Sequence, residues 1–232
     1  MDIRTCADEV VRTLREHLAR SLRGAWLVGS LAWSDFRPAS SDIDVLAVAN
    51  PRPPHVRQAL AEALAAVKCP ARGLEFVLYP TGPDQPFRWQ LNLNTNPPHV
   101  SLDASTEPRH WFVLDVAMAR ERAIPICGPP AAELLAPIPA EQVHQALEES
   151  LAWHEQHEPD RPNAVLNACR AWRYAETGRW SSKTAAALWA REKVDDPGRI
   201  DAALASRHHR AFATSTRSAP ALPEGTTPHR GY

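Results

Sequence analysis

The chain has 232 residues, of which 44% are hydrophobic and 23% are charged, and its formal net charge is −1. These values are typical of a globular protein with one or two domains, and the lack of a basic excess argues against a nucleic-acid partner. No apolar run approaches the roughly 20 residues that cross a bilayer, so we also expect no membrane partner.

The first ten residues, MDIRTCADEV, are acidic and polar where a signal peptide has an apolar core. Four scattered cysteines form no CxxC pair, and we expect them to be reduced thiols: Cys6, Cys69, Cys127 and Cys169. We therefore expect a cytoplasmic protein. No stripe in the sequence indicates oligomerisation, so we expect a monomer.

The N-terminal part alternates predicted helices and strands. Residues 7–23 carry apolar side chains at helical spacing, and Gly24 is expected to end that helix. The following elements are predicted in chain order: a strand over 25–28, a loop over 29–41, a strand over 42–48, a helix over 56–67, strands over 74–79 and 89–96, a helix over 109–122, and a short strand and turn over 124–135.

After residue 137 the strand pattern disappears and helices follow one another. We predict helices over 140–157, 162–178, 181–194 and 198–213. The remainder is polar and rich in proline, without periodicity. The sequence therefore predicts an α+β protein with a strand-containing domain over 1–137, an all-helical domain over 138–213, and a disordered tail over 214–232.

Two aspartates stand at the start of the apolar strand over 42–48. Asp42 and Asp44 are separated by one residue, so their side chains point to the same face of a sheet. Two neighbouring carboxylates repel each other unless a cation or a proton lies between them. Because hard oxygen ligands suit magnesium, we interpret the pair as a Mg²⁺ site.

Two further features support handling of a nucleoside triphosphate. Glu75 lies on the strand over 74–79, and its carboxylate joins the aspartates if that strand is their neighbour. Gly29 and Ser30 end the first strand, where a glycine permits close approach of backbone to phosphate and a serine offers a hydroxyl. A metal site, a phosphate turn and a free carboxylate that acts as base fit nucleotide chemistry.

The stretch GSLAWSDFRPASSDIDVLAV resembles the Gly-Ser…Asp-x-Asp signature of the DNA polymerase β nucleotidyltransferase superfamily. The chain as far as about residue 194 is similar to the aminoglycoside adenylyltransferases that modify streptomycin and spectinomycin. The resemblance also rests on LEFVLY, DVAMARERAIPICGPPAAELLAPIP and NAVLNACRAWRYAETGRWSSKTAAALWA. It implies a mixed sheet that carries the metal site and a helical bundle that closes over it, with ATP in between.

The resemblance also implies residue roles. Asp42 and Asp44 match the metal aspartates, which would hold two Mg²⁺ ions, and Glu75 matches the base that deprotonates the acceptor hydroxyl. Residues implied around the nucleotide are Gly29, Ser30, Ser41, Asp160, Arg170 and Lys183. Arginine and lysine suit this place because they neutralise phosphate charge.

The acceptor site is expected near the junction of the two domains. An aminoglycoside is a polycation, so carboxylates are needed to bind it. Trp153 and Glu158 lie suitably in LAWHEQHEPDRPN, and Asn92 and Asn94 would present neutral amides to a sugar or cyclitol. Similar family members carry a tryptophan near the segment QLNLNTN, where this chain has asparagine and threonine. This difference argues against streptomycin and leaves spectinomycin or another hydroxyl compound open as the acceptor.

Two other functions remain open. The same chemistry could act on a metabolite or on a protein side chain, although small enzymes of the latter kind lack the helical domain. A non-catalytic nucleotide-binding regulator is disfavoured because Glu75 has no use in a module that only binds.

Overall fold

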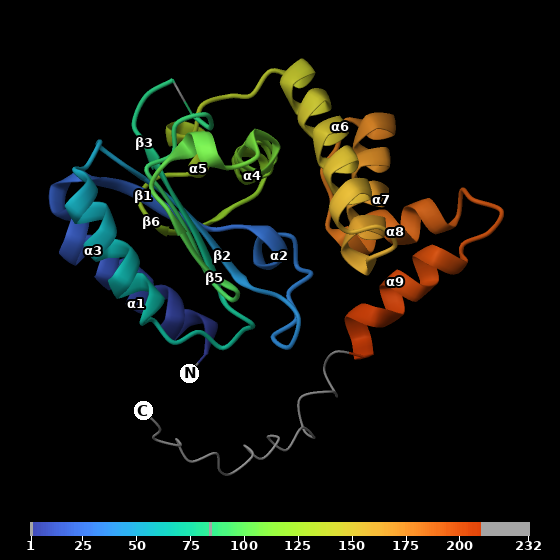
Figure 1. Ribbon diagram of the computed structural model, residues 1–232, viewed down its shortest axis with the longest axis horizontal. Coiled ribbons are helices and arrows are strands. Elements are labelled where there is room, and N and C mark those ends of the chain that lie inside the picture. Colours follow the sequence, from blue (N-terminus) through green and yellow to red (C-terminus); the bar gives the residue numbers. More distant parts are fainter. Residues whose placement is uncertain (1, 84, 210–232) are drawn as a thin grey trace, which may run out of the picture.

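The computed structural model describes residues 2–83 and 85–209, and it consists of a helix-covered sheet joined to a bundle of helices (Figure 1). The predicted disordered tail over 214–232 and the end of the predicted last helix, 210–213, lie outside the described residues. None of the helices in the described part of the chain combines the length and apolar character that a bilayer crossing requires.

The strands of the described chain form one six-stranded mixed sheet with the spatial order β5-β4-β3-β2-β1-β6. They are β1 (Leu22–Leu27), β2 (Ile43–Ala49), β3 (Leu74–Pro80), β4 (Leu91–Thr95), β5 (Pro98–Ser101) and β6 (Ile124–Cys127). The central pair, β2 and β3, runs parallel, and the other neighbouring pairs run antiparallel. A parallel pair needs a crossover connection, and α3 (Pro54–Ala65) provides it.

Helices cover both faces of the sheet. On one face α1 (Ile3–Leu18) and α3 pack against alternate strand residues such as Val45 and Phe76. On the other face α4 (Arg109–Glu121) and α5 (Ala131–Leu134) pack against the intervening residues, including Leu46 and Tyr79. Because side chains alternate along a strand, the residue number already decides which face each β2 and β3 side chain lies on. Short 3-10 turns, Ala19–Ser21 and Ala104–Thr106, complete this unit.

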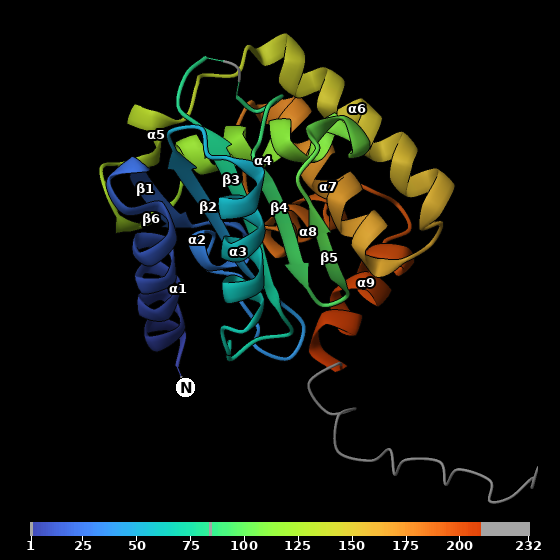
Figure 2. The same cartoon turned by 60° about the vertical axis from the view of Figure 1, so that its left-hand side comes forward.

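The C-terminal bundle is attached through α4. Its helices are α6 (Ala140–His157), α7 (Pro162–Thr177), α8 (Lys183–Arg191) and α9 (Gly198–His209). Val113 and Met118 of α4 pack with Val143 and Leu147 of α6 in one apolar cluster. Figure 2 shows the bundle on the α4 side of the sheet, with α1 and α3 on the opposite side. The bundle therefore packs against the sheet-bearing part through α4 and lies on the side away from α1 and α3.

Most predicted elements are confirmed, and so is the α+β fold with a mixed sheet and a helical bundle. The predicted role of Gly24 is wrong, because α1 ends at Leu18 and Gly24 lies inside β1. A Cβ atom at Gly24 would lie 2.6 Å from the Trp26 ring, so glycine is required there for side-chain packing. The short helix α2 (Gly29–Ala32) and strand β5 were not predicted.

The expectation of four reduced thiols is also corrected. Cys6 on α1 and Cys69 after α3 are joined by a disulfide, with their Cα atoms 5.5 Å apart. The two helices pack side by side on the sheet, which brings residues 63 positions apart into contact. Cys127 and Cys169 are free thiols.

Candidate active site

Three carboxylates meet at the start of the central parallel strand pair. Asp44 on β2 and Glu75 on β3 are paired residues, and both lie on the sheet face that carries Leu46 and Val77 against α4. Asp42 precedes β2, and its carboxylate is close enough to Glu75 to raise the pKa of that residue. The backbone of two adjacent strands thus brings together the three acids that the sequence singled out.

The acids repel one another in the absence of a cation. The pKa of Asp44 is raised well above its ordinary value by burial and by the neighbouring charges of Glu75, Asp115 and Asp42. The pKa of Glu75 is raised to about 7, chiefly by burial and then by Asp42 and Asp115. This part of the fold therefore favours a bound proton or cation.

Arg72 partly relieves the repulsion. Its guanidinium forms a bidentate pair with Asp42, in which Nε donates to Oδ1 at 3.1 Å and the second nitrogen contacts Oδ2. Arg72 is exposed and precedes β3, and its backbone N–H donates to the Ser41 carbonyl at 3.0 Å. Ser41, expected near the nucleotide, therefore fixes the loop that leads into β2, where its own Oγ accepts the Arg37 N–H at 3.1 Å.

The Gly29–Ser30 turn lies directly against Asp44. Gly29 has a φ of +55°, and a Cβ atom there would lie 1.9 Å from Asp44 Oδ2. No side chain other than hydrogen fits this contact, so the turn and the carboxylate depend on each other. Ser30 Oγ is buried and has no hydrogen-bond partner within the described residues. An unpaired buried hydroxyl is costly, and a ligand that accepted its proton would satisfy it.

Basic side chains of the bundle face the acids. The pKa of Lys183, at the start of α8, is lowered to about 8 by burial and by Arg170 and Arg207, whereas Asp44 and Glu75 oppose this shift. Burial also lowers the pKa of Arg170 on α7, against the charges of Asp115 and Asp44. The structure therefore brings the predicted nucleotide residues Arg170 and Lys183 within electrostatic reach of Asp44, one of the two predicted metal residues.

Asp115 is a member of this cluster that the sequence analysis missed. It lies on α4, and it interacts electrostatically with Asp44, Glu75, Arg170 and Lys183. Asp115 is exposed, yet its pKa is raised to about 6, because the surrounding protein displaces part of its hydration; Arg170 and Lys183 oppose the shift. A signal was available, since Asp115 interrupts the apolar run WFVLDVAMA on a predicted helix.

A buried hydrogen-bond chain connects Arg170 to Glu158. Arg170 donates to Asn167 Oδ1 at 3.0 Å, so the Asn167 amide nitrogen is left to donate to His154 Nε2 at 2.8 Å. His154 Nε2 is then an acceptor, so Nδ1 carries the proton and donates to Glu158 Oε2 at 3.0 Å. Burial lowers the pKa of His154, which favours the neutral ring that this arrangement requires, although Glu158 opposes the shift.

Aromatic rings join the two parts of the molecule beside this chain. Trp153 on α6 stacks on His157 with ring centroids 4.6 Å apart and meets the edge of Trp111 on α4 at 5.1 Å. Asn94 on β4 is paired with Glu75, and its buried Oδ1 has no hydrogen-bond partner within the described chain. Asn92 lies two residues earlier on the same face of β4.

Asp160 lies outside the cluster of acids. It is in the turn before α7 with a φ of +60°, and its exposed carboxylate forms an ion pair with Arg199 on α9. Its expected place around the nucleotide stays a prediction.

Comparison with known proteins identifies the family. The chain is 30% identical over 218 residues to an aminoglycoside (3'') (9) adenylyltransferase of Shigella flexneri, which covers 83% of this chain and 80% of that relative. The chain belongs to the aminoglycoside (3'') (9) adenylyltransferase family. It is therefore a nucleotidyltransferase, as the signature around Asp42 and Asp44 predicted.

Other members of the wider group agree with this assignment. A spectinomycin 9-adenylyltransferase of Staphylococcus aureus is 28% identical over 203 residues, covering 79% of this chain and 76% of that protein. The family model for the C-terminal domain of aminoglycoside adenylyltransferases matches residues 133–222. The fold is that of spectinomycin adenyltransferase AAD(9) from Enterococcus faecialis, a structure with ATP and spectinomycin, with a TM-score of 0.74 and 22% identity over 87% of this chain and 88% of that one.

The aspartates of this adenylyltransferase fit a magnesium ion that also binds the substrate. No group of three or more His, Cys, Asp or Glu side chains in the described part of the chain is arranged to hold a metal by itself. Mg²⁺ does not need such a cage, because it is commonly held by one or two carboxylates together with water and substrate phosphates. Burial and neighbouring carboxylates raise the pKa of Asp44 and of Glu75, so the ionised acids are disfavoured there unless a positive charge offsets them.

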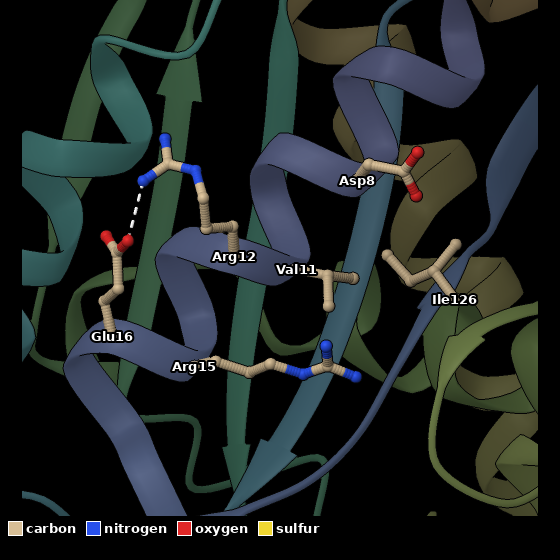
Figure 3. Close-up of a pocket in the computed structure, with 6 residues that line it drawn as sticks. All are labelled: Asp8, Val11, Arg12, Arg15, Glu16 and Ile126. Atoms are coloured by element: carbon tan, nitrogen blue, oxygen red, sulfur yellow. Dashed lines mark hydrogen bonds and ion pairs between the residues drawn. The ribbon is translucent and has the colours of Figure 1, made fainter.

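A separate surface hollow carries none of the predicted site residues. It lies between α1 and β6, has a volume of about 550 Å³ and is lined by Asp8, Val11, Arg12, Arg15, Glu16 and Ile126 (Figure 3). Arg12 is already paired with Glu16 at 2.7 Å. The hollow is lined by both acidic and basic side chains, unlike the candidate active site, where acids are concentrated. We therefore assign the hollow no role.

Proposed function

We propose that the protein transfers AMP from ATP to a hydroxyl group of an aminoglycoside or aminocyclitol antibiotic of the spectinomycin and streptomycin type, and thereby confers resistance. The observation that carries this proposal is the convergence of Asp42, Asp44 and Glu75 on one sheet face, opposite Arg170 and Lys183. A metal–triphosphate substrate requires acidic side chains that bind the cation and, opposite them, basic side chains that bind the phosphates.

Asp42 and Asp44 are the residues that would hold magnesium, with two ions expected from the family resemblance. When bound, Mg²⁺ offsets the charge of the triphosphate and polarises the phosphoryl group that is transferred. Asp42 keeps oxygen lone pairs for this purpose beside its pair with Arg72, because a carboxylate has about four acceptor sites.

Glu75 is the proposed general base. Its pKa of about 7 lies near neutral pH, where a base is most effective. Glu75 accepts the proton of the acceptor hydroxyl, the hydroxyl oxygen forms a bond to the α-phosphorus of ATP, and the bond to pyrophosphate breaks. Arg170 and Lys183 hold the phosphates, while Gly29 lets the backbone approach them and Ser30 donates its unpaired hydroxyl.

The acceptor would lie between the aromatic contact and strand β4. Trp153, which is partly exposed, offers aromatic surface to a sugar or cyclitol, and Glu158 offers a negative charge to a cationic amine. The unpaired Oδ1 of Asn94 is next to Glu75 across the strand pair, so it suits a hydrogen bond from the acceptor near the base. The relatives support this substrate class, since one is an aminoglycoside (3'') (9) adenylyltransferase and another is a spectinomycin 9-adenylyltransferase.

An adenylyltransferase for another small molecule or a protein side chain is the second candidate, because the cluster around Glu75 fixes the chemistry and not the acceptor. A non-catalytic regulator is no longer a candidate, because the relatives are adenylyltransferases. We further infer that the protein works as a monomer in the cytoplasm, where ATP is available.

The test is a direct assay. The purified protein is incubated with ATP, Mg²⁺ and, in turn, spectinomycin, streptomycin and other aminoglycosides, and pyrophosphate and product mass are measured. We expect pyrophosphate release together with an adenylylated antibiotic, and no turnover in Asp44→Asn. Turnover that the variant retains would refute the site, and a wild-type enzyme that adenylylates only unrelated acceptors would leave the second candidate.

A further inference from the structure

Asp35 is a buried carboxylate in the loop between α2 and β2, and no role has been assigned to it. Its side chain is only 9% exposed. Its backbone N–H donates to the Ser30 carbonyl at 2.9 Å, and the residue before it, Ser34, has a φ of +54°. The loop is therefore folded back onto the Gly29–Ser30 turn, and it directs the Asp35 side chain away from the sheet.

Within the part of the chain that the structure describes, two residues of the helical bundle bind the Asp35 carboxylate. Thr184 on α8 donates to it twice, from its backbone N–H to Oδ2 at 3.1 Å and from its hydroxyl to Oδ1 at 2.7 Å. Arg207 on α9 pairs with Oδ2 at 3.1 Å and also donates to the Asp35 carbonyl at 3.2 Å. Two helices are thus attached to one residue of the signature loop.

Through these contacts Asp35, which lies in the loop between α2 and β2, helps to cap the N-terminus of α8 in the helical bundle. The first N–H groups of a helix lack partners within the helix. In α8, Ser182 accepts the Ala185 N–H at 3.0 Å, and Asp35 accepts the Thr184 N–H. A negative charge at a helix N-terminus is also favoured by the helix dipole, and charged hydrogen bonds are stronger than neutral ones.

Asp35 connects the start of α8 to the Gly29–Ser30 turn. Thr184 directly follows Lys183, whose Nζ contacts Asn163 Oδ1 at 2.6 Å. On the other side Asp35 is bonded to Ser30. A shift of α8 away from the loop would therefore carry Lys183 away from the Gly29–Ser30 turn and from the three acids.

We propose that Asp35 is a positioning residue for the nucleotide, because it ties the start of α8 to the phosphate turn and so fixes the distance between Ser30 and Lys183. This inference rests on the proposed function in one respect, namely that Lys183 binds the nucleotide. The attachment of α8 to Asp35 can be tested without that assumption.

The first experiment measures amide hydrogen exchange at residue resolution in the full chain. In Asp35→Asn, which keeps the shape of the side chain and removes its charge, we expect faster exchange of the Thr184 N–H and unchanged exchange of the Ala185 N–H, which Ser182 caps. Unchanged exchange at Thr184 would overturn the proposal, and so would an equal acceleration at both amides.

The second experiment measures the Kd of ATP with Mg²⁺, and separately the KM for the acceptor. In Asp35→Asn we expect the Kd for ATP to rise about tenfold or more, as for loss of a charged hydrogen bond, with an unchanged KM for the acceptor. Asp201→Asn is the matched control, because it removes a carboxylate from an ion pair between α8 and α9, Asp201 with Arg191, which does not reach the loop.

Thr184 keeps the test valid if Asp35→Asn does not fold. Thr184→Val removes the hydroxyl and should weaken ATP binding, whereas Thr184→Ser retains it and should restore binding. A folded Asp35→Asn with normal ATP affinity, a control that weakens ATP binding equally, or Thr184→Val and Thr184→Ser with equal affinity would each overturn the proposal. If the wild type binds no ATP, the proposed function fails, and the exchange of the Thr184 amide alone decides the attachment.

Discussion

Asp44 and Glu75 are direct neighbours across the parallel strands β2 and β3, and both side chains point toward α4. Adjacent strands are about 4.8 Å apart, so the backbone itself holds the two carboxylates close together. Burial is the main cause that raises the pKa of both groups, and neighbouring carboxylates add to it: Glu75, Asp115 and Asp42 for Asp44, and Asp42 and Asp115 for Glu75. The fold therefore holds these carboxylates close together at a cost in free energy, and under the proposed function a bound magnesium–nucleotide complex would offset that cost.

Removal of the charge of Asp44 or of Glu75 should lower activity without lowering stability. Glu75→Gln is expected to lower kcat by about 10²–10⁴-fold, the usual contribution of a general base, and Asp44→Asn should abolish turnover. The pKa of Glu75 is about 7 in the folded protein, above its ordinary value of 4.5. Between these two pH values the unfolded chain is ionised at Glu75 while the folded protein keeps the proton, so the free energy of unfolding falls as pH rises. Both variants should therefore melt at or above the wild-type temperature at pH 7.5, as measured by thermal unfolding.

The exposed Asp8 on α1 provides the control for these variants, since Asp8→Asn removes a carboxylate far from the cluster. It should leave turnover and melting temperature unchanged. A Glu75→Gln protein with wild-type kcat would contradict the assigned base.

Magnesium should stabilise the protein through the aspartates even without ATP. A ligand at a hundredfold excess over its Kd contributes about 2.7 kcal/mol to the free energy of unfolding. For a chain of this size, that corresponds to a rise in melting temperature of roughly 5–10 °C. We expect the rise in the wild type at pH 7.5 and not in Asp44→Asn, and removal of Mg²⁺ by a chelator should reverse it. Equal shifts in both proteins would place the ion elsewhere.

Gly29 should tolerate no side chain. Gly29→Ala adds a Cβ atom 1.9 Å from Asp44 Oδ2 at a φ of +55°, so the turn or the carboxylate must move. Gly178 is a matched control, because its φ is +64° and nothing lies within 4 Å of an added Cβ. Gly178→Ala should cost about 1–2 kcal/mol of stability with normal activity, as expected for backbone strain alone. Gly29→Ala should lose more stability and nearly all turnover, measured by denaturant unfolding and pyrophosphate release; equal effects of the two changes would argue against a dependence on contact with Asp44.

The acidic core of the site could be predicted because it depends on local rules. Asp42 and Asp44 share a face by strand alternation, and Glu75 joins them once β3 is the neighbour of β2. The sheet faces of β2, β3 and β4 followed from the same alternation, and the C-terminal helices followed from apolar spacing and capping residues such as Ser182 and Gly178.

What could not be predicted depends on packing between distant elements. Asp115 joins the cluster because α4 lies across the sheet, and no local rule gives that placement. The predicted helix runs to residue 23, but residues 22 and 23 lie in β1, because pairing of β1 with β2 and β6 outweighs the helical spacing there. Likewise, the link between Asp35 and Thr184 spans 149 residues, and the disulfide of Cys6 with Cys69 depends on the packing of α1 beside α3.

Lys183 should set the alkaline limit of the reaction. Burial and the nearby Arg170 lower its pKa to about 8, so the free enzyme loses this positive charge as pH rises through 8. A lysine whose folded pKa is lowered destabilises the charged fold below that pH, while the bound triphosphate needs the charge. We therefore expect kcat/KM for ATP, which reports the pKa values of the free enzyme, to fall above about pH 8 while stability rises. Lys183→Arg remains charged over this pH range and should abolish the fall of kcat/KM above about pH 8, which is the alkaline limb of the profile. Its forked guanidinium can lower the absolute rate. The exposed Lys193, substituted in the same way, should leave the limb in place; a limb that persists near pH 8 in Lys183→Arg would assign the titration to another group.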